Sequence, residues 1–344
     1  MSIFSKVGML FRGDFPVASG AVSGFEEVEP FEEGFSKHYD AHLRPHVSSF
    51  EERRIAALKK ASRRARVGIP LLTVASPLLL IALIIAVPDD DGGLMGAVAI
   101  LIGLGYWYIS QPIRKYKQNI KGDIFPNILN FLGDFKYNPE CGKRVSTLEP
   151  SGLVPSHDKE ASEDEIIGTY KDVEIDFFET ELKRRRRDSK DRTSYSTVFD
   201  GVFITLSMNK NFSGHTMVRR DAGAIGNWFK DKFSKLERVE LEDPIFEKKF
   251  QVYSSDQVEA RYLLTTSFME RLLDLGDAFD SKKLECSFYE NRLLIKIDVT
   301  ENLFEPGSIF EPEDFIDDAK TVLADMHQIF RVIDTLKLDQ NIKL

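Results

Sequence analysis

The sequence predicts the α+β fold class: a two-helix transmembrane hairpin, then a cytoplasmic domain with a mainly antiparallel sheet and a long C-terminal helix. Residues 67–87 and 94–111 are two long runs without a charged side chain, and basic clusters lie outside both of them. From residue 163 onward, apolar residues first alternate along the chain, as in strands, and later recur at helical spacing.

The first uncharged run, 67–87, holds 21 residues. A helix of that length spans about 31 Å, close to the hydrocarbon thickness of a bilayer. Residues 88–93 contain three aspartates and two glycines, which predict a short extracytoplasmic turn before the second span, 94–111. Two buried helices of a soluble core are the alternative. Residues 78–85 are apolar on every helical face, which favours the membrane.

Positive charge flanks the predicted hairpin, whereas the connecting turn carries only aspartates. The flanking basic residues are Arg53, Arg54, Lys59, Lys60, Arg63, Arg64 and Arg66 before the hairpin and Arg114, Lys115, Lys117 and Lys121 after it. Positive flanks stay on the cytoplasmic side of a membrane. We therefore expect a multi-pass protein of the inner (plasma) membrane with both termini in the cytoplasm.

Composition limits the classes of partner and cofactor. The chain of 344 residues has a net charge of −9, and most of its basic clusters flank the membrane runs, so no nucleic-acid partner is expected. Cys141 and Cys286 are far apart and belong to no metal-binding motif, which indicates reduced thiols and no zinc site. No cleavable signal peptide is expected, since Arg12 and Asp14 interrupt the early apolar residues.

The rest of the chain divides into four segments. Residues 1–30 are predicted to form a flexible arm, with one or two amphipathic turns as the alternative. Pro45 divides a basic helical segment, 31–66, whose second helix should start at this proline and run into the first membrane span. Residues 112–162 should form a helix and a linker, and residues 163–340 the cytoplasmic α+β domain.

Several elements of that domain have local signals. Alternation predicts strands at 173–177, 198–208, 217–218 and 250–253. Lys171 and Asp172 should turn the chain into the first strand, and Glu290 with Asn291 should join a hairpin of 284–288 and 293–299. A long amphipathic helix is predicted for 313–336, directly after Pro312.

Two segments have patterns typical of lipid or partner contact. A polar hairpin loop is predicted for 182–193, and an amphipathic helix for 222–236. A solvated loop and a helix packed on the core are the respective alternatives. The candidate lipid- or partner-binding residues are Arg184, Arg185, Arg186, Arg187, Trp228, Phe229 and Lys232.

The most concentrated polar set is Asp256, Glu259 and Arg261. The spacing of Asp256 and Glu259 predicts a capping box, in which each side chain satisfies a backbone N–H at the start of a helix. In an enzyme, Glu259 and Arg261 would instead line a cleft, with the arginine holding an anionic ligand. A helix cap with a structural ion pair is the simpler interpretation.

Other arrangements with catalytic or metal-binding potential are weaker. Three histidines recur every four residues, but Pro45 interrupts their helix and no metal site is predicted. These are His38, His42 and His46. Asp200, Ser213 and His215 could be combined into a hydrolytic triad, although nothing in the sequence fixes their geometry. No glycine-rich phosphate loop is present, and no cofactor is expected.

One stretch of sequence carries a family resemblance. Its residues are Phe250, Val252, Tyr253, Ser254, Asp256, Gln257, Glu259, Ala260, Arg261, Tyr262, Leu263, Leu264 and Thr265, then Met269, Glu270, Arg271 and Leu272. This stretch resembles the bacterial membrane-protein family DUF3137, a domain of unknown function, and weaker similarity extends over roughly residues 31–336. The resemblance implies a membrane hairpin with a cytoplasmic α+β domain, and no activity. It marks Tyr253, Asp256, Glu259, Arg261, Tyr262, Met269 and Arg271 as motif residues.

The leading functional hypothesis is a membrane-anchored scaffold or adaptor that faces the cytoplasm. It would bind a protein partner, a second copy of itself or anionic lipid at the inner membrane. A membrane-associated enzyme, such as a hydrolase with Glu259 and Arg261 in a cleft, is the alternative. An accessory subunit of a transporter or channel is a third possibility. No catalytic motif is present, so the sequence assigns no reaction.

Overall fold

The computed structural model describes residues 3–17, 24–86, 93–187, 193–220, 235–278, 284–299 and 302–338. The chain forms two compact units. Unit 1 comprises Met1–Ile128 and Pro306–Lys320, and unit 2 comprises Leu129–Glu305 and Thr321–Leu344. Each unit is described separately below.

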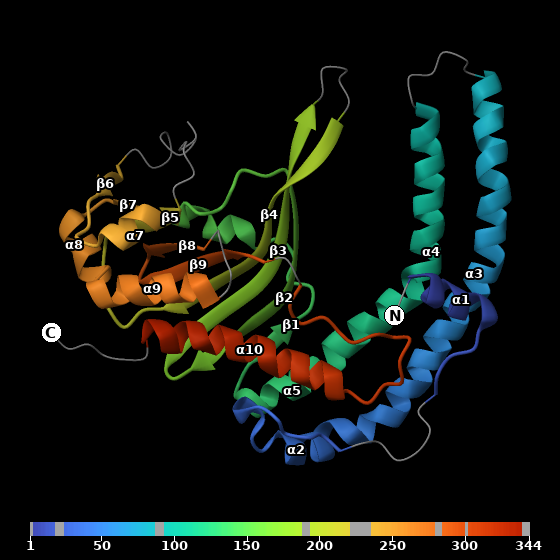
Figure 1. Cartoon of the computed structure of the whole chain (residues 1–344), viewed down its shortest axis with the longest axis horizontal. Coiled ribbons are helices and arrows are strands. Elements are labelled where there is room, and N and C mark those ends of the chain that lie inside the picture. The colour runs from blue at the N-terminus through green and yellow to red at the C-terminus, as the bar shows by residue number, and fades with distance from the viewer. Residues whose placement is uncertain are drawn as a thin grey trace. The chain divides into compact units, whose positions relative to one another are not determined.

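Unit 1 is mainly helical. Its elements are α1 (Ile3–Arg12), a 3₁₀ turn (Pro30–Glu32), α2 (Phe35–His38), a π-helical turn (Tyr39–Leu43), α3 (Arg44–Ala86), α4 (Gly93–Asp123) and the start of α5 (Phe125–Leu132). As predicted, a new helix begins next to Pro45 and continues into the first apolar run. The helices α3 and α4 lie side by side (Figure 1), and Leu72 packs directly against Gly105.

The predicted transmembrane hairpin is supported only in part. Among the described residues, one helical stretch, Gly96–Leu132, is long and apolar enough to cross a membrane, and only 6 % of its apolar window is buried. The first predicted span lies in α3, but most side chains beyond Leu78 fall outside the described residues, as does most of the predicted turn, 88–93. The two-helix hairpin is therefore not confirmed as a pair.

Residues 3–12 form helix α1, so this part of the predicted flexible arm, 1–30, follows the alternative of amphipathic turns. Side chains of α3 hold its C-terminal end: Ser62 Oγ donates to the carbonyl of Leu10 at 2.5 Å, and Arg66 Nε donates to that of Phe11 at 2.7 Å. These bonds satisfy carbonyl groups that a helix end leaves unpaired. The sequence of the arm alone gave no sign of partners some 50 residues away.

Unit 2 contains an antiparallel sheet, as predicted, with nine strands among the described residues in the order β1-β2-β3-β4-β9-β8-β5-β7-β6 (Figure 1). The strands are β1 (Lys136–Asn138), β2 (Lys159–Tyr170), β3 (Val173–Arg187), β4 (Thr193–Ser207), β5 (Thr216–Arg220), β6 (Glu237–Val239), β7 (Phe250–Ser254), β8 (Glu285–Tyr289) and β9 (Arg292–Asp298). Among its described residues, three α-helices begin in this unit: α7 (Pro244–Lys249), α8 (Gln257–Leu263) and α9 (Thr266–Ala278).

Both predicted two-residue turns are present. Lys171 and Asp172 join β2 to β3 with φ of 48° and 65°, and Glu290 and Asn291 join β8 to β9 with φ of 50° and 57°. Two successive positive φ values match the right-handed twist of a hairpin, and they fix the register of each pair.

The two faces of the sheet are covered differently. On one face, Phe304 packs on Phe177 and α9 places Phe268 against Phe288, with ring centroids 5.5 and 5.6 Å apart. Helix α10 (Ile316–Leu336) adds Phe330, which stacks on Tyr170 at 4.0 Å. The opposite face holds an apolar cluster under the segment 145–154. Its buried members are Val145, Leu148, Leu153, Val154, Phe178, Leu182, Phe199, Phe203, Met217, Tyr289 and Leu294.

The arginine run lies in a strand, so the predicted polar loop is wrong for residues 182–187 and 193, whereas residues 188–192 lie outside the described residues. Strand β3 continues to Arg187, and β4 begins at Thr193. Arg184 pairs with Ser196, and Arg187 pairs with Thr193. Ladder hydrogen bonds involve only the backbone, so a polar, exposed extension of a hairpin can form without the apolar alternation used for the prediction.

Candidate functional site

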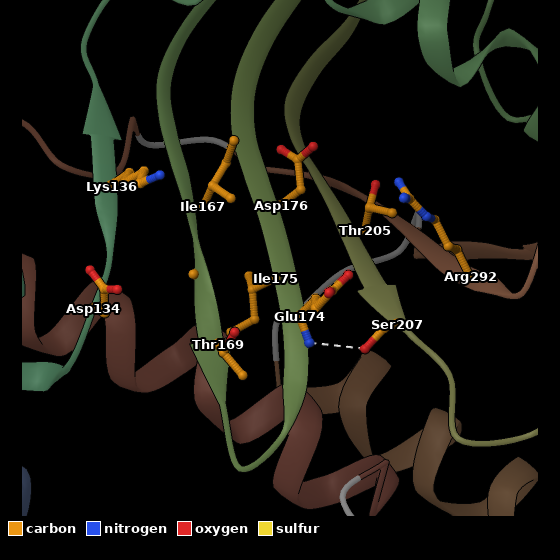
Figure 2. A pocket seen from close by; sticks show the side chains of 11 residues that line it. Asp134, Lys136, Ile167, Thr169, Glu174, Ile175, Asp176, Thr205, Ser207 and Arg292 are labelled. Carbon is orange, nitrogen blue, oxygen red and sulfur yellow. Dashed lines mark hydrogen bonds between the residues drawn. The ribbon is translucent and has the colours of Figure 1, made fainter.

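A groove lies on the second face of the sheet, beyond the apolar cluster (Figure 2). Its volume is about 400 Å³, and five strands or their flanking residues contribute to it. The lining residues are Asp134, Lys136, Ile167, Gly168, Thr169, Glu174, Ile175, Asp176, Thr205, Ser207 and Arg292.

Strand register explains why most of these side chains meet on one face. Thr169 pairs with Glu174, and Ile167 pairs with Asp176, which is opposite Thr205 on β4. Side chains directly opposite each other on paired strands share a face of a sheet, and so do side chains two residues apart on one strand. In the same way, Ser207 lies opposite Arg292. Chain segments more than 100 residues apart thus contribute to one surface.

Arg144 organises the charges at one end of the groove. Its guanidinium pairs with Asp176 at 2.6 Å and with Glu165, and it lies 5.6 Å from the centre of the Phe178 ring. The backbone N–H of Arg144 donates to Glu160 Oε1 at 2.7 Å. These contacts hold the arginine in place, so the carboxylate of Asp176 has a fixed orientation in the groove wall.

The second carboxylate oxygen of Asp176, Oδ1, is shielded from solvent and has no hydrogen-bond partner in the part of the chain that the structure describes. A buried acceptor without a donor costs free energy. Because Oδ1 is shielded, a ligand in the groove would reach it only after neighbouring side chains moved. Exposed Lys136 and Arg292 add positive charge nearby, and Ile167, 40 % exposed, adds an apolar centre (Figure 2).

The hydroxyl groups of the groove are not arranged as nucleophiles. The Oγ atom of Ser207 accepts a hydrogen bond from the backbone N–H of Glu174 at 2.9 Å (Figure 2). A nucleophilic hydroxyl needs a base within hydrogen-bonding reach. Among the described hydrogen bonds, none joins Ser207 or Thr205 to a histidine or a carboxylate.

The motif segment forms the predicted helix cap but not the full capping box. Asp256 Oδ1 accepts from the N–H groups of Val258 and Glu259 at 2.8 and 3.0 Å, which caps α8. Glu259 does not complete the box: Oε2 accepts from Ser213 N at 2.9 Å and Oε1 from Gly214 N at 2.7 Å. The carboxylate thus joins α8 to the loop that precedes β5.

Arg261 also binds backbone. It donates to the carbonyl groups of Gln257 at 3.0 Å and Glu240 at 3.3 Å. Neither Arg261 nor Glu259 lines a described pocket of the chain. Both side chains thus bind backbone groups of the helix and its adjacent loops, and a catalytic role for the pair stays a prediction.

The other motif residues contact neighbouring groups of the protein or are buried. Tyr253 donates its hydroxyl to Gln251 Oε1 at 2.8 Å. The carbonyl of Tyr262 accepts from Lys210 Nζ at 3.1 Å, and the same ammonium lies 4.6 Å from the ring centre. Met269 is buried, and Arg271 is half-buried on α9. A functional role for these residues stays a prediction.

The candidate lipid- or partner-binding residues are only partly described. Arg184 Nε donates to the carbonyl of Ser156 at 2.9 Å, and the backbone N–H of Arg185 donates to Asp158 at 2.7 Å. The side chains of all four arginines, including Arg186 and Arg187, are exposed or half-buried on β3. Trp228, Phe229 and Lys232, with most of the predicted 222–236 helix, lie outside the described residues.

The histidines do not assemble a catalytic or metal site within the described ranges. His38 bonds to the carbonyl of Asn127 at 2.7 Å and its ring lies 4.5 Å from that of His42, yet no group of three metal-binding side chains is found there. His215 Nε2 lies 2.9 Å from Ser287 Oγ and 3.0 Å from the carbonyl of Ser151. Burial lowers the pKa of His215, which favours a neutral ring.

Sequence reasoning missed the groove. The charged neighbours of the alternating apolar residues on β3, Glu174 and Asp176, are its visible signal, because alternation points them away from the apolar face. Their partners on β4 and β9 could not be inferred, since the order of strands in the sheet was unknown.

Comparison with known proteins gives a family and no activity. A solved structure, the crystal structure of the mycobacterial trehalose monomycolate transport factor A (TtfA), matches with 13 % sequence identity over 62 % of this chain and 96 % of that chain, at a TM-score of 0.33. A TM-score of this size is too low to indicate a shared fold or function. No curated protein matches the chain. Residues 197–338 match the model of the family described as "Protein of unknown function (DUF3137)". The resemblance predicted from the 250–272 segment is thereby confirmed over residues 197–338, which are similar to this family.

Proposed function

We propose that this protein is a membrane-anchored adaptor: α3 and α4 hold the chain in the inner membrane, and unit 2 binds a protein partner on the cytoplasmic side. The observation that carries the proposal is the uncovered apolar surface of α3 and α4. Apolar side chains on both helices are 60–70 % exposed: Val67, Leu71, Leu78, Ile100 and Leu104.

Water is an unfavourable environment for such a surface. Each square ångström of exposed apolar area costs about 25 cal/mol relative to burial, and large contiguous apolar patches mark contact with a membrane or a partner. Trp107 and Tyr106, which prefer the membrane–water interface, are also exposed near the basic end of the apolar part of α4. A bilayer would cover all of these groups at once.

The basic flanks support a cytoplasmic location for the start of the first apolar run, in α3, and for the end of the second, in α4. Arg64 lies over the ring of Tyr108 at 4.2 Å, and Arg114 over that of Trp107 at 5.8 Å. Each arginine thus sits beside an aromatic residue that prefers the interface, on the side where positive charge is retained. This orientation would place unit 2, and the parts of unit 1 outside the two membrane runs, in the cytoplasm.

The groove of unit 2 supports binding of a protein segment. An exposed apolar residue, Ile167, is surrounded by charged groups of both signs, including Lys136, Asp176 and Arg292. An apolar centre with a polar rim is the usual anatomy of a protein interface. No hydroxyl in the groove is paired with a base in the described structure, so binding is better supported than catalysis.

Membrane anchoring can be tested with the full chain expressed in bacterial cells. Membranes would be washed with alkaline carbonate and then extracted with mild detergent. We expect the protein to remain in the membrane pellet after carbonate and to be released by detergent. Release by carbonate alone would contradict integral insertion.

Partner binding can be tested by purification from the detergent extract, with two matched variants. Ile167→Asp places a charge at the centre of the groove, and Val258→Asp places the same charge on α8, where Val258 is 77 % exposed. We expect a partner recovered with wild type and Val258→Asp to fall at least tenfold with Ile167→Asp. Equal recovery with both variants would exclude the groove as the binding surface.

A further inference from the structure

A second cavity lies between α3 and α4, within unit 1. Its volume is about 560 Å³. The walls are mainly apolar and include Val67, Leu71, Leu101 and Leu104, whereas Arg63 and Arg64 lie at one end. The cavity therefore has two parts: an apolar part, called the channel below, lined by Val67, Leu71, Leu101 and Leu104, and a cationic end at Arg63 and Arg64.

Two glycines set the spacing of the helices beside this cavity. A Cβ atom on Gly105 would overlap Leu72 Cδ1, so a side chain at position 105 would force the end of the Leu72 side chain to move. One helical level away, Gly68 faces Ile109, whose Cδ1 would lie 3.4 Å from a Cβ at that position. Small residues of this kind permit close helix packing in membranes. The larger leucines next to them then border the channel instead of filling it.

The two arginines have different roles at the cationic end. Arg64 is fixed, because it donates to the carbonyl of Tyr108 at 2.6 Å and to Gln111 Oε1 at 2.9 Å. Arg63 is exposed and makes no hydrogen bond or ion pair with any residue that the structure describes. Its guanidinium can therefore bind an external anion.

No acidic side chain opposes these arginines along either helix near the cavity. The sequence has no aspartate or glutamate from 53 to 66 or from 93 to 122. An occupant with a negative headgroup would thus meet only positive charge, and a guanidinium fork matches the oxygens of a phosphate.

We propose that this cavity binds an anionic phospholipid, with an acyl chain in the channel and the headgroup phosphate on Arg63 and Arg64. The inference rests on the proposed membrane anchoring. An anionic lipid is favoured over a free phosphate because most of the wall is apolar. It is favoured over a zwitterionic lipid because no acidic side chain is present to pair with a headgroup amine.

The test uses the full chain in bilayer vesicles and two photoactivatable lipids, an anionic phosphatidylglycerol and a zwitterionic phosphatidylcholine, each with a diazirine on one acyl chain. Labelled residues are mapped by mass spectrometry. We expect the anionic probe to label the channel, at 67–72 and 101–109, several-fold more than the zwitterionic probe. Arg63→Gln with Arg64→Gln should reduce this labelling roughly thirtyfold, the factor that corresponds to two lost arginine–lipid contacts of about 1 kcal/mol each.

Two controls separate a defined site from general charge attraction. Lys59→Gln with Lys60→Gln removes the same charge from exposed positions that do not line the cavity, and should change labelling less than twofold. Leu104→Trp should fill the channel and reduce labelling without any change of charge. Equal loss with both charge variants, or equal labelling by the two probes, would overturn the proposed site. If the protein is still retained after carbonate, either result would leave the proposed anchoring intact.

Discussion

The guanidinium of Arg54 forms a two-point contact with the carboxylate of Glu51 inside unit 1, with Nε 2.7 Å from Oε2 and one terminal nitrogen 2.8 Å from Oε1. Arg54 is fully buried. It also donates to the carbonyl of Ile309 at 2.8 Å and to that of Pro16. One arginine on α3 thus holds both the segment that precedes α10 and the N-terminal arm. Arg66, which is exposed, hydrogen-bonds only to the N-terminal arm among the described residues, through the carbonyl groups of Phe11 and Arg12.

We predict that Arg54→Met will strongly destabilise unit 1. The substitution leaves Glu51 buried without its cation and removes donors from two carbonyl groups, and breaking a buried pair from one side costs about 3–5 kcal/mol. Arg53→Met is the matched control, because Arg53 is half-exposed and its pair with Asp123 is 3.5 Å long. An exposed pair contributes less than about 1 kcal/mol. Thermal melting of the detergent-solubilised proteins would measure both, and equal melting temperatures would contradict the role assigned to Arg54.

We predict that the stability of unit 1 falls as pH rises from about 5 to about 8. Burial, and then the neighbouring carboxylate of Asp318, raise the pKa of Glu313 to about 8. Tyr116 donates to Glu313 at 2.9 Å, and the N–H of Gly307 donates to Asp318 at 2.7 Å. The folded chain keeps its proton on Glu313 where the unfolded chain, with a glutamate pKa near 4.5, has lost it. The folded state therefore binds more protons in this window, and stability decreases with pH.

Glu313→Gln tests that pH dependence. Glutamine stays neutral and can still accept the hydrogen bond from Tyr116, so melting temperature should vary less between pH 5 and 8. A smaller slope should persist at the acidic end, because burial also raises the pKa of Asp318 in the same unit. The exposed neighbour Glu311, changed to Gln, should retain the wild-type slope. Identical pH profiles for wild type and Glu313→Gln would show that this carboxyl is ionised in the folded state.

We predict that Glu259→Ala will loosen the loop before β5. Two backbone N–H groups, on Ser213 and Gly214, would lose their acceptor, and an unsatisfied donor costs about 1–3 kcal/mol. Hydrogen exchange should accelerate at 208–215, whereas Glu270→Ala, at an exposed position on α9, should leave it unchanged. Unchanged exchange in Glu259→Ala would argue against the structural role and reopen a functional one.

We predict that Gly201→Ala will disrupt the pairing of β4 with β9. Gly201 has φ of 156°, and a Cβ there would overlap the carbonyl oxygen of Ile297 and lie 2.9 Å from Asp298 Cα. Backbone must move to relieve this contact, since neither atom belongs to a flexible side chain. Gly122→Ala is the control: Gly122 is the second-last residue of α4 and nothing lies within 4 Å of its Cβ position, so alanine should fit there without strain and leave stability unchanged or slightly higher. Protein yield and melting temperature should therefore both fall in Gly201→Ala, and both should stay unchanged or rise in Gly122→Ala.

The elements that the sequence determined are those with local causes. Pro45 placed the start of α3, and Asp256 capped α8 through N–H groups two and three residues away. Glu290 and Asn291 turned the β8–β9 hairpin. Each of these signals acts within a few residues, so no knowledge of the rest of the fold was needed.

Tertiary structure alone decided the helix at residues 3–12, the strand that carries the four arginines and the groove of unit 2. Ser62 and Arg66 hold the helix at 3–12. Thr193 and its neighbours on β4 pair with the arginine-bearing strand β3. Arg144 orients Asp176 in the groove. All three depend on partners distant in sequence, whose identity is fixed by strand order and helix packing. Periodicity shows which side of an element is buried, but only the assembled fold shows what it is buried against.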